Sequence, residues 1–148
     1  MFVYLDVTYL KNHKMTSENY PGVLDRVKAI TIDAFILVLF IFIISFMFSF
    51  FENVPDYIKM IAFVFIFLLY DPIFTSTFGG TMGHMIIGIR VKRARNEQKN
   101  IFFPLAIVRF IIKAFLGVIS LITVTGNIKR KAIHDFAAGS VVVYAKPV

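Results

Sequence analysis

The sequence contains no cysteine, which excludes disulfide bonds, thiolate catalysis and thiolate metal sites. Charged residues are also scarce: they make up 17% of the 148 residues, whereas soluble chains carry roughly a quarter. Hydrophobic residues make up 58%, and the mean hydropathy is +0.77. A water-soluble fold of this length cannot bury so much apolar surface. The composition therefore predicts an integral membrane protein.

Two apolar runs are long enough to cross a bilayer. Residues 29–51 and 58–76 match the ~20 helical residues that span a hydrocarbon core of ~30 Å. The net charge of +7 comes largely from Lys and Arg that flank these runs, which indicates membrane topology and not nucleic-acid binding. We expect residues 1–19 to form a cytoplasmic N-terminal segment without a signal-peptide core. Residues 20–148 are expected to form one membrane domain.

A third apolar segment, residues 104–125, raises a conflict. It is long enough to span, but Arg109 and Lys113 lie on one face of it, four residues apart. The basic stretch NIKRK follows, and a full crossing would place that stretch outside. A re-entrant or interfacial pair of helices that breaks near Gly117 removes the conflict, and a full crossing is the alternative. The predicted fold class is thus an all-α membrane protein with a small β-hairpin, two transmembrane helices and this third membrane segment.

Strand-like patterns occur outside the apolar runs. Ile87, Ile89 and Val91 alternate with polar residues or glycine, and RNEQKN follows as a polar turn, which predicts a cytoplasmic β-hairpin. The stretches FVYLDVTYL and SVVVYA, residues 2–10 and 140–145, could join it in a small sheet. The basic residues from Arg90 to Lys99 are expected to attract anionic lipid headgroups or to act as a topology signal.

An aspartate within the first apolar run is the most informative residue. A charged Asp33 at membrane depth costs about 2.5–3.5 kcal/mol, so it needs a partner. Arg26 lies on the same helical stripe but ~10 Å away along the axis. We therefore expect Asp33 to pair with Arg109 or, second, with Lys113. Such a pair is either a structural clasp or part of a path for ions or protons.

No catalytic or cofactor site can be assembled from the sequence. His13, His84 and His134 share no metal-binding spacing and are expected at surfaces or interfaces. The GGTMG stretch lacks the Gly-Lys-Ser/Thr of a phosphate-binding loop and is expected to form a sharp turn. Asp71 precedes a proline and is predicted to be a turn or cap residue, with the alternative that it lines a polar cavity with Asp33. We expect no enzyme activity, cofactor, bound metal or nucleic acid.

Three stretches resemble, in this order, the RDD family of bacterial membrane proteins, named for one arginine and two aspartates. They are YPGVLDRVKAITIDAFIL, GGTMGHMIIGIRV and HDFAAGSVVV. The family residues correspond to Arg26, Asp33 and Asp135. The glycine-rich turn comprises Gly79, Gly80, Thr81, Gly83 and Gly88. The chain departs from the family pattern at His84, where a lysine is usual, and at Ser140, where a threonine is usual.

The resemblance implies a multi-pass protein of the bacterial inner membrane with a loose link to transport, including sodium/proton exchange. One hypothesis is a small-ion transport component that uses membrane-embedded carboxylates and must oligomerise to enclose a path. The alternative is a non-enzymatic assembly subunit, a homo-oligomer or a partner of another membrane protein, whose Arg/Asp set is structural. The expected ion-pair network comprises Arg26, Asp33, Arg109, Lys113 and Asp135. Asp135 is either a second ion-binding acid or a structural partner of Arg26 or of the KRK cluster.

Overall fold

A computed structural model describes residues 20–51 and 53–145. The predicted strand at residues 2–10 and His13 lie outside them. The chain folds as helices α2 (Val23–Phe48), α3 (Asp56–Thr77), α4 (Met82–Ile87), strands β1 (Ile89–Arg93) and β2 (Asn96–Asn100), helix α5 (Phe103–Leu116), the 3₁₀ helix η1 (Gly117–Val124), helix α6 (Ile133–Ala137) and strand β3 (Ser140–Tyr144). The fold is therefore mostly helical with a small sheet, as predicted.

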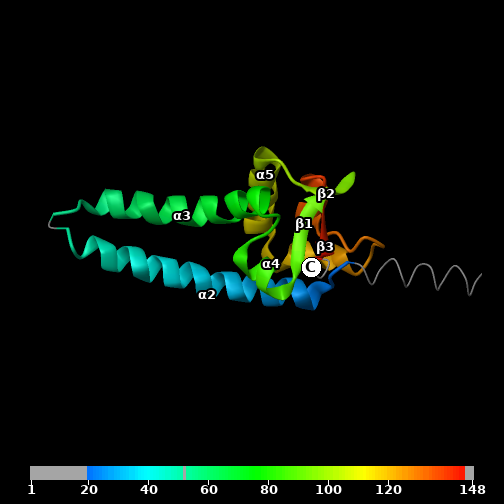
Figure 1. Ribbon diagram of the computed structural model, residues 1–148, viewed down its shortest axis with the longest axis horizontal. Helices are drawn as coiled ribbons and strands as arrows, with labels where there is room; N and C mark the ends of the chain where they lie inside the picture. Colours follow the sequence, from blue (N-terminus) through cyan, green and yellow to red (C-terminus); the bar gives the residue numbers. More distant parts are fainter. Residues whose placement is uncertain (1–19, 52, 146–148) are drawn as a thin grey trace, which may run out of the picture.

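Three helical segments are long and apolar enough to cross a membrane: Val23–Phe48, Asp56–Thr77 and Phe103–Val124. The antiparallel helices α2 and α3 lie side by side and form a long hairpin (Figure 1). Aromatic pairs join them, with ring centroids 6.2 Å apart for Phe40–Tyr70 and 6.4 Å apart for Phe48–Phe63. Most of the other apolar side chains of the hairpin are exposed. In a bilayer these side chains contact lipid or another protein.

Helix α3 continues past the position where the sequence predicts a turn. Asp71 and Pro72 lie inside the helix, which ends only at Thr77, so the prediction of a turn or cap at Asp71 is wrong. Hydroxyl groups satisfy carbonyls in the last turns: Ser76 Oγ donates to the Pro72 carbonyl at 2.8 Å, and Thr77 Oγ1 donates to the Ile73 carbonyl at 2.6 Å. These bonds lie in the last turns of the helix, C-terminal to the Leu68 carbonyl whose N–H donor Pro72 removes.

The third membrane segment breaks at Gly117, where the sequence predicts a break. Helix α5 ends at Leu116, and η1 begins at Gly117, whose φ of +53° favours glycine. Helix α5 runs across one end of the α2–α3 hairpin and not alongside it (Figure 1). It packs against α3, with the rings of Phe67 and Phe110 5.9 Å apart.

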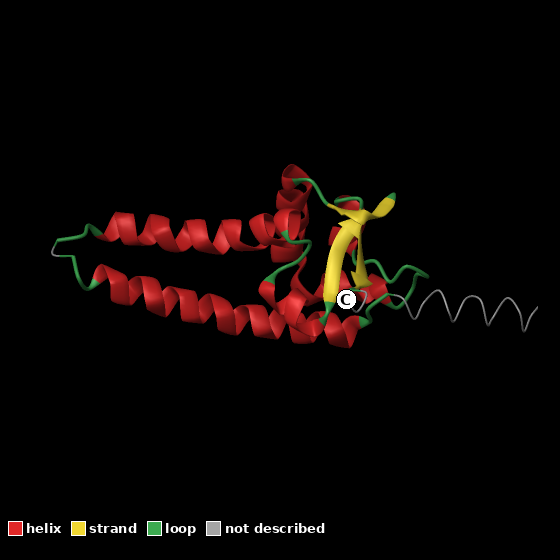
Figure 2. Ribbon diagram, viewed as in Figure 1, coloured by secondary structure: helices red, strands yellow, loops and turns green. Residues whose placement is uncertain are grey.

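The predicted β-hairpin is present as β1 and β2, and β3 joins it in an antiparallel sheet of order β2-β1-β3. The predicted bounds of the hairpin are wrong: Ile87 belongs to α4, and most of the predicted polar turn forms β2, so that the turn is at residues 94–95. The sheet lies at the end of the molecule opposite the α2–α3 loop (Figure 2). Its buried side chains Ile89, Val91 and Val142 form one apolar core with Ala29 of α2 and Ala106 of α5. The sheet thereby ties the membrane helices together at this end.

Candidate functional site

Asp33 joins three helices through hydrogen bonds from uncharged groups. Its Oδ1 accepts from the Tyr70 hydroxyl at 2.8 Å and from the Gly83 N–H at 2.7 Å. Its Oδ2 accepts from the Thr81 hydroxyl at 2.5 Å. The Asp33 side chain is 8% exposed. It thus fastens α2 to α3 and to the first turn of α4.

The glycine-rich turn permits this close approach. A Cβ at Gly83 would overlap the carbonyl oxygen of Ala29 and would lie 2.8 Å from the Asp33 carboxylate. Gly88 ends α4 with φ +78°, a left-handed conformation that lets β1 begin at once. Glycine at position 83 therefore sets the distance between α2 and α4.

His84 is buried beside Asp33, so the prediction of a surface or interfacial side chain is wrong. Its Nδ1 lies against the Thr81 hydroxyl and 3.7 Å from Asp33 Oδ2. Because that hydroxyl donates its hydrogen to Asp33, the network assigns a proton to His84 Nδ1. Burial lowers the pKa of His84, and the charges of Lys113 and Arg109 lower it further. The nearby Asp33 raises this pKa but does not offset the decrease. Position 84, where the family pattern has lysine, therefore places a neutral ring beside Asp33 that donates to Thr81, and Thr81 in turn donates to Asp33.

Asp135 is the centre of a second cluster. Its side chain is fully buried and accepts from Arg26 Nη1 at 2.6 Å and from Arg109 Nε at 3.0 Å. The Ser140 hydroxyl donates at 3.2 Å, as does the Ala132 N–H. Burial would raise the pKa of Asp135, but the Arg109 and Arg26 charges hold it far below its usual value. Asp135 was expected to be either a second ion-binding acid or a structural partner of Arg26 or of the KRK cluster. These contacts favour the role of structural partner of Arg26.

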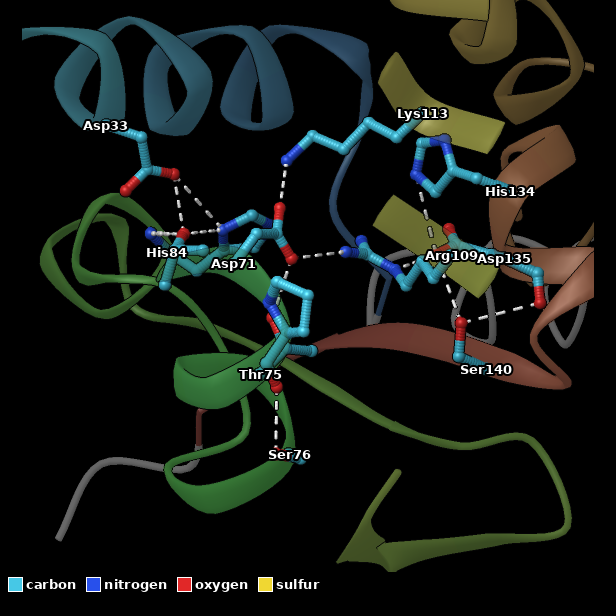
Figure 3. Close-up of polar contacts among 12 residues, drawn as sticks. Asp33, Asp71, Thr75, Ser76, His84, Arg109, Lys113, His134, Asp135 and Ser140 are labelled. Atoms are coloured by element: carbon cyan, nitrogen blue, oxygen red, sulfur yellow. Dashed lines mark hydrogen bonds and ion pairs between the residues drawn. The ribbon is translucent and has the colours of Figure 1, made fainter. Parts of the chain in front are cut away.

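Asp71 forms the third acidic position and had no predicted place in the network. Lys113 Nζ lies 2.6 Å from Asp71 Oδ2, and Arg109 Nη1 lies 3.7 Å from Oδ1 (Figure 3). The Thr75 hydroxyl also donates to Oδ1 at 3.0 Å. Arg109 therefore lies between Asp71 and Asp135.

The expected pairing of Asp33 with Arg109 or Lys113 is wrong. Arg109 and Lys113 are instead occupied by Asp135 and Asp71, as described above. The cause is that α3 remains helical through Asp71, which places a third carboxylate opposite α5. The three acids and the three cations Arg26, Arg109 and Lys113 balance in formal charge. Two donors, Arg26 Nε and Arg109 Nη1, are buried without a hydrogen-bond partner among the described residues.

His134 is also buried, against the prediction of a surface position. The Ser120 hydroxyl lies 2.6 Å from its Nδ1 and accepts its backbone N–H at 3.2 Å. The ring Nε2 lies 3.6 Å from Asp135 Oδ1. Burial and the Arg109 charge lower the pKa of His134 to about 3, so the ring is neutral near pH 7. It links η1 to α6 without adding a charge.

A cavity of about 250 Å³ lies among α2, α3, α5 and η1. Most of its lining is apolar, from residues such as Leu37, Phe67 and Phe110. The polar side chains that reach it are Asp33, Tyr70, Asp71, Thr81, Lys113 and His134. It is therefore a mostly apolar space that two of the carboxylates and one ammonium group line.

Sequence reasoning missed Tyr70, Ser120 and His134 as members of the site, and it gave Asp71 only as an alternative, lining a cavity with Asp33, which the structure shows. For Asp71 a signal was present, because an acid at the end of an apolar run needs a partner as much as Asp33 does. For Ser120 and His134 the sequence contains no comparable signal, since their contact depends on how η1 folds back on α6. The remaining predicted positions do cluster: Arg26, Arg109 and Asp135 meet directly, and Asp33 and Lys113 line one cavity.

The fold and this site define a multi-pass membrane protein with a charge-balanced cluster buried where its helices meet. The model of the RDD family matches residues 20–139, and the chain belongs to that family. Comparison with curated proteins and with solved structures gives no match.

Proposed function

We propose that this protein is a component of a proton-coupled carrier for small cations, in which Asp71 and Lys113 form the exchange pair. The observation that supports this proposal is the ion pair of 2.6 Å between these residues at the wall of the membrane cavity. The Lys113 side chain is 19% exposed, whereas that of Arg109 is 1% exposed. Lys113 is thus the most accessible cation of the cluster.

The chemistry follows from the difference between lysine and arginine. A lysine ammonium can lose its proton in a buried site, whereas a guanidinium keeps its charge. A monovalent cation that binds the Asp71 carboxylate takes the place of the Lys113 ammonium. Lys113 then releases one proton to water, and the net charge of the site is unchanged. One proton is exchanged for one cation.

Oxygen atoms near the pair suit a small hard cation. Asp33, Thr81 and Tyr70 line the same cavity and offer carboxylate and hydroxyl oxygens, the ligand type that such cations prefer. The described residues contain no group of three or more His or acidic side chains that could hold a metal ion permanently. A carrier needs binding that is weak enough for release.

A second candidate function is an assembly subunit whose Arg/Asp set is purely structural. The two hydrogen bonds that Asp135 accepts from Arg26 and Arg109 favour this structural function, because the carboxylate has no capacity left for a transported ion. Within the carrier proposal, Arg26, Arg109 and Asp135 form the fixed frame against which the Asp71–Lys113 pair acts.

The test is proton flux in liposomes that contain the purified protein and an internal pH-sensitive dye. An imposed Na⁺, Li⁺ or K⁺ gradient should drive proton movement, and Asp71→Asn and Lys113→Met should each abolish it. Asp56→Asn and Lys59→Met are matched controls on α3, because these side chains are 98% and 39% exposed and do not line the cavity. Flux that is absent, or that is equal in Asp71→Asn and Asp56→Asn, would leave the assembly function as the better account.

A further inference from the structure

The loop of residues 125–131, between η1 and α6, forms an open hollow of about 710 Å³ on the surface. Lys129, Arg130 and Lys131 line it together with the apolar side chains Ile128 and Phe136. None of these residues takes part in the exchange pair. From this combination we propose that the hollow is a binding site for the headgroup of an anionic phospholipid.

The position of the loop argues for a lipid. It directly follows η1, whose side chains Val118, Ile119 and Ile122 are all more than 60% exposed. In the hollow itself, Ile128 is 49% and Phe136 is 55% exposed. Apolar groups beside cations suit a molecule that has a phosphate and an acyl region, whereas a free phosphate would use only the cations.

The cations of the hollow are only partly neutralised. Lys129 Nζ lies 3.3 Å from Glu97 Oε1, in an exposed pair that contributes little. Lys131 Nζ lies 5.3 Å from the centre of the Phe136 ring, and no carboxylate of the described residues pairs with it. Burial and the charge of Lys129 lower the pKa of Lys131. A phosphate would relieve the repulsion between these two ammonium groups.

The loop is held in one shape before any ligand binds. Asn127 accepts from the Lys131 N–H at 2.8 Å and donates to the Lys131 carbonyl at 2.9 Å. The Arg130 carbonyl accepts from Arg26 Nη2 at 2.6 Å, and Arg130 Nη1 donates to the Tyr20 carbonyl at 2.9 Å. The buried cluster thus fixes the backbone of the hollow, which reduces the entropy lost on binding.

The basic hairpin of residues 90–99 is a weaker candidate for the same ligand. Lys92 donates to Asn100 Oδ1 at 2.7 Å, and Arg93 donates to the Asn100 carbonyl at 2.8 Å. Arg93 also stacks on Phe102, 3.6 Å from the ring centre. These cations are engaged within the fold, while Arg95 and Lys99 remain exposed.

The experiment is native mass spectrometry of the full chain in detergent, titrated with phosphatidylglycerol or with phosphatidylcholine. The wild type should bind phosphatidylglycerol preferentially, and Lys129→Gln/Lys131→Gln should weaken that binding by roughly tenfold to thirtyfold. Arg95→Gln/Lys99→Gln removes the same charge from the hairpin and should leave binding unchanged. Phe136→Ala should weaken lipid binding as well, and millimolar inorganic phosphate should not displace the lipid.

Three results would overturn the proposal. One is equal binding of the two lipids by the wild type. Another is an equal loss in the hairpin variant and in the loop variant, which would indicate a general charge effect. The third is displacement of the lipid by inorganic phosphate, which would assign the hollow to a free anion.

Discussion

Replacing Asp135 by asparagine should destabilise the protein more than any other single loss of charge in the cluster. The variant keeps the volume of the side chain but leaves Arg26 and Arg109 buried without their carboxylate. Loss of one partner from a buried pair typically costs about 3–5 kcal/mol. At about 2–4 °C per kcal/mol for a chain of this size, the melting temperature in detergent should fall by about 10 °C.

A double-mutant cycle identifies the cause of that loss. Arg26→Gln alone should cost less, because Asp135 keeps Arg109 and its two neutral donors. Asp135→Asn/Arg26→Gln should cost less than the sum of the single variants, by about 1–3 kcal/mol, because one stranded guanidinium is gone. Asp33→Asn with Arg109→Gln is the matched control, since these residues share no hydrogen-bond partner and should be additive within about 0.5 kcal/mol. Additivity in the first cycle, or coupling only in the second, would refute the assignment of partners.

Three further predictions concern packing, pH and topology. Gly83→Ala should lower the free energy of unfolding by about 1–3 kcal/mol, because the added Cβ overlaps the Ala29 carbonyl. Gly126→Ala is the control and should be nearly neutral in thermal melts, because its Cβ meets only the Thr123 carbonyl, at 3.8 Å. Between pH 6.5 and about 3 the unfolded chain protonates His134 while the folded chain does not, so the melting temperature should fall as the pH falls below 6.5. His134→Gln should make the melting temperature depend less on pH in this range. An unchanged dependence would contradict the burial of a neutral ring. Single cysteines at Asn53 and Asn127 should react with a membrane-impermeant reagent from opposite sides of the bilayer. The reason is that the α2–α3 loop and the loop after η1 lie at opposite ends of the hairpin (Figure 1). Labelling of both cysteines from one side would contradict this topology.

The elements were predictable because their signals are local. The apolar runs, the alternation around Ile89 and the break at Gly117 each depend on a few neighbouring residues, and the structure has a helix, a strand and a helix end there. The partners of the charged residues were not predictable in the same way. Similar depth in the membrane allows several pairings among the acids and cations, and only the three-dimensional packing selects one.

Asp33 illustrates this limit. The sequence requires a partner for a carboxylate at this depth, and it points to cations because they carry the opposite charge. The structure instead supplies two hydroxyls, from Tyr70 and Thr81, and the backbone N–H of Gly83; the last two come from the start of α4. Helix α3 continues through Pro72 before the turn into α4, whereas the sequence rule for proline predicts that the helix ends there.

The central claim, that a cation and the Lys113 proton compete for Asp71, is tested most directly by proton release. Purified protein in weakly buffered detergent solution receives sodium chloride, with choline chloride as the control for ionic strength. The account predicts release of about one proton per chain on addition of Na⁺, no release from Lys113→Met, and normal release from Lys59→Met, whose lysine pairs with Asp56 outside the cavity. Absence of release from the wild type, or equal release from Lys113→Met, would contradict the account.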